Sequence, residues 1–194
     1  MTAGSLAPPR FSCSHIQIFQ IPLPEWGEKN CFLAIVGPDA LEQKLAVKKI
    51  VLSLDSILRQ VSLPVSGDDD SIDRLVRNMC DTMYAAGGSG LSAVQIGILK
   101  RVIIVDSAGG GLRQSQPFVN PEIIETAGDM VTVREACLSI AGVIINVTRP
   151  SKVRVRYSLL TGEQREIIAE GDLGRGIQHA IDHLNGILIL DHRE

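Results

Sequence analysis

Hydrophobic and polar residues follow a regular pattern only from about residue 47 onward. The earlier part contains five of the nine prolines and the only tryptophan, and it sustains no period. We therefore predict an N-terminal extension of uncertain structure over residues 1–46, with short strand-like runs at 16–21 and 32–36. Residues 47–194 are long enough for one well-packed domain.

An amphipathic helix is predicted over residues 71–86. Its apolar residues recur at positions i, i+3, i+4 and i+7, so they share one face of a helix. Asp70 or Ser71 is a suitable N-cap, and the glycine-rich turn at 87–90 ends the helix. The apolar positions are Ile72, Leu75, Val76, Met79 and Met83.

Strand-like runs follow at residues 101–106, 118–125, 131–140, 143–148 and 152–160. A further run at 164–170 is predicted to pair with the last of these across a turn at 160–163. A second helix is predicted from Asp172, as its N-cap, to Gly186, which is a suitable C′ residue. This order is α+β, and we expect small antiparallel or mixed β-sheets packed around a central helix.

Composition and charge exclude several classes of protein. The chain is 45% hydrophobic and 21% charged, which is ordinary for a globular domain. Its net charge of −3 gives no electrostatic reason to expect a nucleic-acid partner. No apolar stretch is long enough to span a membrane, and no secretion signal is recognisable. We expect a cytoplasmic protein. The first 24 residues contain no Asp or Glu, as in an organelle-targeting segment, but Arg10 is the single arginine there and gives that interpretation little support.

Two histidines on the second predicted helix form a candidate metal site. His179 and His183 are four residues apart, so both rings project from one helical face and can chelate one divalent ion. The same spacing is compatible with two unrelated histidines. Cys137, in a strand-like run about forty residues earlier, is a chemically suitable third ligand. Cys13, Cys31 and Cys80 are expected to be reduced, buried thiols.

Three blocks of sequence resemble the signature segments of peptide deformylases, in the same order. Residues 90–97, GLSAVQIG, are similar to the family's GLAAPQxG. Residues 135–139, EACLS, are similar to EGCLS, and residues 178–186, QHAIDHLNG, are similar to QHExDHLxG. The sequence is thereby identified as a member of a family that removes the formyl group from the N-terminal formyl-methionine of nascent polypeptides.

The resemblance implies roles for individual residues. Cys137, His179 and His183 would hold one divalent metal ion, with Fe²⁺ expected first and Zn²⁺ or Ni²⁺ as alternatives. The side-chain amide of Gln95 and the backbone N–H of Leu138 would donate hydrogen bonds to the formyl oxygen. The backbone of Gly90 and Leu91 would pair with an extended peptide substrate. The expected partner is the N-terminal peptide of a nascent chain, with ribosome association as a further expectation, and the protein is expected to be a monomer.

The residues Glu135 and Arg149 have two interpretations. They are suitable for a structural ion pair that braces the strand carrying Cys137. The alternative is that both are ordinary surface charges in contact with solvent.

The sequence departs from the family at the catalytic carboxylate. Ala180 stands where the family has the Glu that receives and passes on the proton, and losing such a group lowers the rate by about 10² to 10⁴. Asp182 is the nearest spare carboxylate, but it projects about 200° around the helix from Ala180. Val94, Ala136 and Ala141 depart from the same motifs.

The leading interpretation is a deformylase-like protein that retains metal and peptide binding but has little or no hydrolytic activity. One alternative is a working metal-dependent deformylase, or related amide hydrolase, that uses another base. A second alternative is a binding module without a metal ion.

Overall fold

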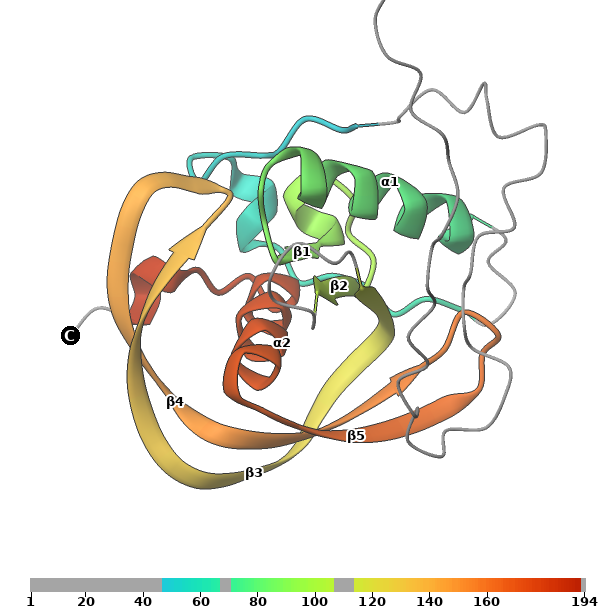
Figure 1. Ribbon diagram of the computed structural model, residues 1–194. Coiled ribbons are helices and arrows are strands. Elements are labelled where there is room, and N and C mark those ends of the chain that lie inside the picture. Colours follow the sequence, from blue (N-terminus) through green and yellow to red (C-terminus); the bar gives the residue numbers. More distant parts are fainter. Residues whose placement is uncertain (1–46, 67–70, 107–113, 193–194) are drawn as a thin grey trace, which may run out of the picture. The chain divides into compact units, whose positions relative to one another are not determined.

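A computed structural model describes residues 47–66, 71–106 and 114–192 of the chain. The predicted extension at 1–46, with its strand-like runs, lies outside the described residues. The described part is an α+β domain, as predicted (Figure 1). Its elements in chain order are η2 (Ser56–Arg59), α1 (Ile72–Ala85), β1 (Gly90–Ser92), η3 (Ala93–Ile96), β2 (Val102–Asp106), β3 (Ser115–Cys137), β4 (Ile140–Ser158), β5 (Gln164–Glu170), α2 (Gly171–Leu184) and η4 (Ile189–His192).

The strands form one antiparallel sheet of five strands, in the order β1-β2-β3-β4-β5. Two long strands each replace two shorter predicted ones. β3 continues through Gly128, whose φ is +75°, and its pairing with β4 shifts register between Ala127 and Met130. Such irregularities bend a strand without ending it, because pairing resumes on the far side. The predicted hairpin between β4 and β5 is confirmed.

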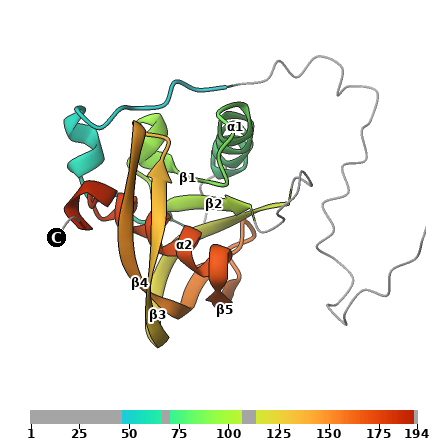
Figure 2. The same cartoon turned by 60° about the vertical axis from the view of Figure 1, so that its left-hand side comes forward.

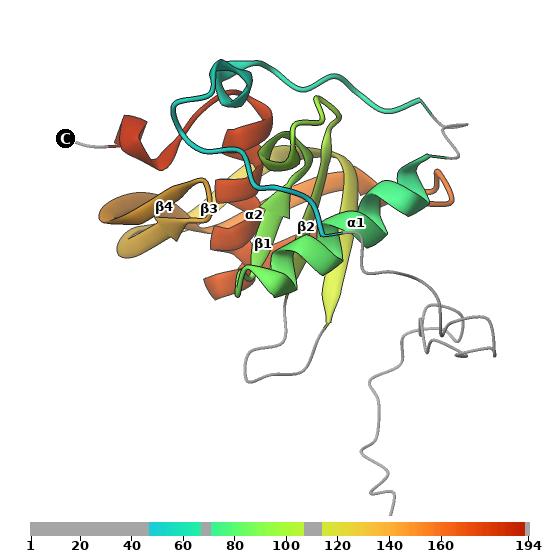
Figure 3. The ribbon, with the colours of Figure 1, turned by 90° about the horizontal axis from the view of Figure 1, so that it is seen from above.

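Strand β2 lies between the two helices, which explains its uninterrupted apolar sequence. Ile103 and Val105 belong to the same hydrophobic cluster as the inner face of α2, which presents Ile177, Ala180, Ile181 and Leu184. Val102 and Ile104 belong instead to the cluster formed by α1. All five apolar residues predicted for the buried face of α1 are buried. Figure 2 shows β3 and β4 curving past α2. Figure 3 shows α1 and α2 on opposite sides of β1 and β2.

Helix α2 starts earlier than predicted. Its N-cap is Glu170, so the prediction of Asp172 as N-cap was wrong, and Asp172 lies in the first turn. The helix follows β5 without a loop, because Gly171 makes the corner with a φ of +57°. Gly174 then allows the first turn to approach β5 closely, since a Cβ there would lie 2.7 Å from the carbonyl oxygen of Ala169. At the other end Gly186 occupies the C′ position with a φ of +75°, as predicted.

Within the described residues, neither helix is long and apolar enough to cross a membrane.

Candidate metal centre

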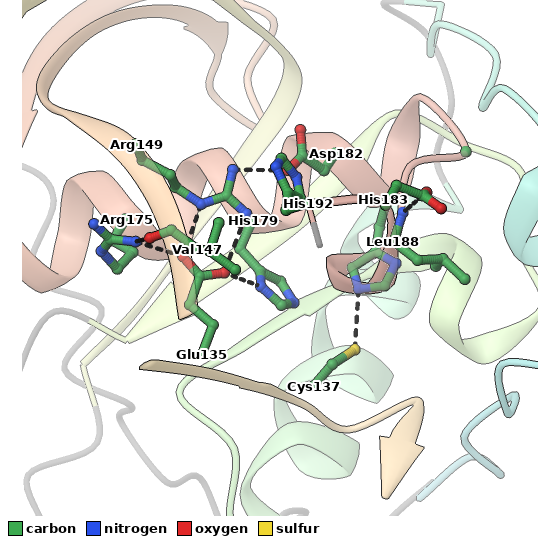
Figure 4. Close-up of polar contacts among 12 residues, drawn as sticks. Glu135, Cys137, Val147, Arg149, Arg175, His179, Asp182, His183, Leu188 and His192 are labelled. Atoms are coloured by element: carbon green, nitrogen blue, oxygen red, sulfur yellow. Dashed lines mark hydrogen bonds and ion pairs between the residues drawn. The ribbon is translucent and has the colours of Figure 1, made fainter. Parts of the chain in front are cut away.

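Cys137, His179 and His183 meet at the junction of the sheet and α2 (Figure 4). One ligand atom from each side chain lies within 4.8 Å of the other two. Sγ of Cys137 is 3.2 Å from Nε2 of His183, and the two imidazole centroids are 5.0 Å apart. The fold therefore brings together the three residues that the sequence selected.

Two features of local structure place these side chains. His179 and His183 are one helical turn apart on α2, and the apolar stripe of the same helix fixes its rotation against the sheet. Cys137 is the last residue of β3, after a register shift between Ala136 and Cys137. Such a shift re-aims a side chain at the end of a strand.

The donor set fits a divalent metal ion. One thiol and two imidazoles are suitable for tetrahedral coordination, for which the sulfur–nitrogen separation would be about 3.6 Å. The observed 3.2 Å requires only a small outward movement. His183 is almost fully buried, and its Nδ1 has no hydrogen-bond partner among the described residues. Its Nε2 is the nitrogen that faces the sulfur.

Glu135 forms the centre of a buried ionic network beside the cluster. Its Oε2 lies 3.0 Å from Nδ1 of His179, which leaves Nε2 of that ring for a metal ion. Arg149 donates to both carboxylate oxygens, at 2.7 and 3.1 Å, and both side chains are 5% exposed. The predicted structural ion pair is therefore confirmed, and the surface-charge interpretation is wrong. Arg149 also donates to Asp182 at 2.7 Å, and Asp182 contacts Nε2 of His192 at 3.0 Å.

These contacts shift the pKa values of the network in the metal-free protein. Burial lowers the pKa of His179, but hydrogen bonds to Cys137 and Glu135 outweigh it and raise that pKa to about 9. Burial and the nearby charges of His179 and Arg149 lower the pKa of His183 to about 3. Burial raises the pKa of Glu135, yet hydrogen bonds from His179, Arg149 and Arg175 bring it well below its usual value. Glu135 is thus a buried carboxylate that stays charged.

Gln95 reaches the cluster from η3. Its Oε1 accepts a hydrogen bond from the backbone N–H of Ser92 at 2.9 Å, in a reciprocal capping arrangement. Its Nε2 donates to Oγ of Ser139 at 3.1 Å and points toward Sγ of Cys137 at 3.7 Å. The amide predicted to bind a formyl oxygen therefore lies against the candidate ligand.

The other predicted substrate residues surround the same point. Leu138 directly follows Cys137, and its side chain covers Gly88, where a Cβ would lie 2.6 Å from Cδ1 of Leu138. Gly90 and Leu91 lie on β1, which pairs with β2 on one side only. Among the strands that the structure describes, the other edge of β1 has no partner. The Leu91 side chain itself is buried in the α1 cluster.

Ala180, which directly follows His179, is buried in the apolar cluster of α2, and its carbonyl accepts a hydrogen bond from Oγ of Ser92 at 2.8 Å. The cluster of potential ligands found in the described ranges contains no carboxylate. Glu135 and Asp182, the nearby acids, are both bound to arginine.

Sequence reasoning missed several residues of this site. The capping pattern Ser92-x-x-Gln95 was visible in the sequence and would have predicted both η3 and the orientation of Gln95. Arg175 gave no such signal, because its main partner, Glu135, is 40 residues away. The same holds for Ser139, which meets Gln95 across 44 positions.

Fold and donor set together are typical of an α+β metalloprotein with a single-ion site. The sequence matches the family model described as polypeptide deformylase over residues 47–194. The peptide deformylase of Phenylobacterium zucineum (strain HLK1) is 45% identical over 150 residues, which cover 76% of this chain and 88% of that protein. The peptide deformylase of Natranaerobius thermophilus is also 45% identical over 150 residues, covering 77% and 94%.

Comparison with solved structures gives the same family. A class I type b peptide deformylase from Acinetobacter baumannii with bound Met-Ala-Ser superimposes with a TM-score of 0.73 at 33% identity, covering 77% of this chain and 100% of that one. The peptide deformylase from Synechococcus elongatus in complex with actinonin gives 0.72 at 39% identity, covering 77% and 85%. The chain belongs to the peptide deformylase family, whose enzymes use a metal ion to remove the formyl group from N-terminal methionine.

Proposed function

We propose that the protein binds a divalent metal ion through Cys137, His179 and His183. We further propose that it holds formylated N-terminal peptides at this site but hydrolyses them slowly. The observation that carries the proposal is Ala180, a buried alanine directly after His179 on the helix whose two histidines are otherwise arranged as ligands. Fe²⁺ is the proposed ion, with Zn²⁺ or Ni²⁺ as alternatives, because thiolate and imidazole suit all three.

Peptide binding rests on groups that do not depend on position 180. When bound, a divalent ion supplies Lewis-acid polarisation of a carbonyl and lowers the pKa of a water molecule. Gln95 would donate its amide hydrogen to the formyl oxygen, and the backbone N–H of Leu138 would be a second donor. The edge of β1 that no described strand pairs with offers backbone groups to an extended peptide.

Slow turnover follows from the missing proton acceptor. Hydrolysis of an amide needs a group that takes a proton from water and delivers it to the leaving nitrogen. Alanine has no such group. Glu135 accepts hydrogen bonds from two arginines and contacts His179, and Asp182 contacts Arg149 and His192, so moving either acid would break buried ion pairs. The expected deficit is about 10² to 10⁴ in rate.

The test compares the parent protein with A180E and A180Q, all purified anaerobically and loaded with Fe²⁺. Glutamine matches glutamate in size but does not titrate. We expect A180E to hydrolyse a formyl-Met-Ala peptide about 10² to 10⁴ times faster than the parent, and A180Q to remain near the parent. Calorimetric titration of the parent should detect binding of the same peptide.

Three outcomes would overturn the proposal. A parent rate within about tenfold of A180E would indicate a working hydrolase with another base. A parent that binds metal but gives no heat with the formyl peptide would contradict peptide holding. A metal content below roughly one ion per ten chains would indicate a metal-free binding module.

A further inference from the structure

Arg175 connects the helix that carries both histidines to the hairpin that carries the cysteine. It lies on α2, four residues before His179. Its Nη1 donates to Oε1 of Glu135 at 2.7 Å and to the carbonyl of Val147 at 3.1 Å, and its Nη2 donates to the carbonyl of Val131 at 2.6 Å. Val131 and Glu135 are on β3, whereas Val147 is on β4. One side chain thus ties α2 to both strands.

Arg149 makes the reciprocal connection. It lies on β4 and reaches Glu135 on β3 and Asp182 on α2. Both arginines share Oε1 of Glu135, while Oε2 contacts Nδ1 of His179. The Glu135 side chain is 5% exposed and that of Arg175 is 16% exposed. Because the Glu135 carboxylate has so little contact with solvent, its position depends on the protein groups that donate hydrogen bonds to it.

We propose that Arg175 is a positioning residue of the metal centre, which acts through Glu135 to fix the His179 ring and through two backbone carbonyls to fix the distance from α2 to Cys137. This inference rests on the metal site of the proposed function and not on its slow turnover. Groups that orient a ligand typically change metal affinity by about 10- to 100-fold when they are removed. Arg149 contacts carboxylates, whereas Arg175 is the side chain of α2 that donates to the strand carbonyls of Val131 and Val147.

The test measures Co²⁺ binding by the full chain. R175M removes the charge and all three hydrogen bonds but keeps a side chain of similar length. R175K keeps the charge but cannot span the same acceptors. R156M is the matched control, because Arg156 on β4 also donates hydrogen bonds to a carboxylate, that of Glu166, but on an exposed surface.

We expect chelator competition to give a Co²⁺ dissociation constant about 10- to 100-fold higher for R175M than for the parent. R175K should fall between them, and R156M should match the parent. The cobalt absorption bands should shift in R175M and stay unchanged in R156M, since they report the geometry of the ligands. The double variant R175M/E135Q should lose less affinity than the sum of the two single losses, because both changes interrupt the contact between Arg175 and Glu135.

Parent-like affinity and spectrum in R175M would overturn the inference, and so would additive losses in the double variant. If circular dichroism finds R175M unfolded without metal, R175K decides, and a parent-like dissociation constant for R175K then overturns it. Failure of the parent to bind Co²⁺ would overturn both this inference and the metal site. A missing rate difference between A180E and the parent would leave the role of Arg175 unaffected, so the two failures are distinguishable.

Discussion

The Glu135 carboxylate lies 3.0 Å from Nδ1 of His179, on the side of the ring away from the candidate metal position. In the metal-free protein this contact favours a charged ring. In the metal-bound protein the same contact would hold the neutral ring with Nε2 free for the ion. Together with the hydrogen bond to Cys137, which also raises the pKa of His179, this contact couples metal uptake to loss of a proton from the His179 ring.

Metal affinity should accordingly depend on pH. The pKa of His179 is raised to about 9, so its ring is charged at pH 7 and must lose a proton before it binds a metal ion. His183, with its pKa lowered to about 3, is already neutral. We expect the apparent Zn²⁺ affinity to rise between pH 6.5 and about 9 and then to level, as measured by chelator competition. Calorimetry in buffers of different ionisation enthalpy should detect the released proton.

The variant E135Q is the control for this dependence. It removes the negative charge beside His179, so the rise in affinity should end at a lower pH than in the parent. An affinity that is flat from pH 6.5 to 9 in the parent would contradict the coupling.

The same two histidines predict how the stability of the metal-free protein changes with pH. The folded pKa of His179 is above its ordinary 6.5, so its stabilising contribution is complete below pH 6.5 and is lost as pH rises through about 9. The folded pKa of His183 is below 6.5, so its destabilising effect grows as pH falls from 6.5 toward about 3. Urea unfolding of the metal-free parent and H179N should differ most below pH 6.5 and converge above about 9.

Gln95 should contribute to catalysis without being required for metal binding. In the A180E background, Q95L should lower the hydrolysis rate of a formyl-Met peptide by about 10² to 10³, because it removes a donor to the developing oxyanion. Co²⁺ affinity should stay within about threefold of the background, since Gln95 makes only a long contact to Sγ of Cys137. The matched variant S139A removes the other partner of the Gln95 amide but keeps the amide itself. A rate as low in S139A as in Q95L would argue against an oxyanion role.

The C-terminal end of α2 should be intolerant of a side chain at Gly186. A Cβ there would lie 2.5 Å from the carbonyl oxygen of Arg59, and the φ of +75° is unfavourable for alanine. We expect G186A to lower the free energy of unfolding by about 2–4 kcal/mol in urea titrations. Gly87, the corresponding residue after α1, has a φ of +67° but nothing within 4 Å, so G87A should cost only about 1–2 kcal/mol. Equal losses in the two variants would contradict the close contact with Arg59.

Features that depend on local sequence were predicted well. The buried face of α1 and the end of α2 at Gly186 follow from helical periodicity and from the conformational freedom of glycine. The start of α2 was not predicted correctly, because β5 continues to Glu170 by pairing with β4, and that pairing overrides the preference of Asp172 for an N-cap. β3 and β4 were each predicted as two strands. An irregularity within one strand and a loop between two strands look alike in a sequence, because the pairing partner is not known.

The sequence alone determined which residue types lie one helical turn apart on α2, and that Ala180 stands between the histidines, because helical spacing is a property of neighbouring positions. Only the tertiary structure decided that Cys137 reaches those histidines and that Glu135 is buried among two arginines. It also decided that Arg175 spans the helix and both strands. Those contacts join residues 14 to 46 positions apart, and their distances are set by how the sheet bends around α2, which no local pattern records.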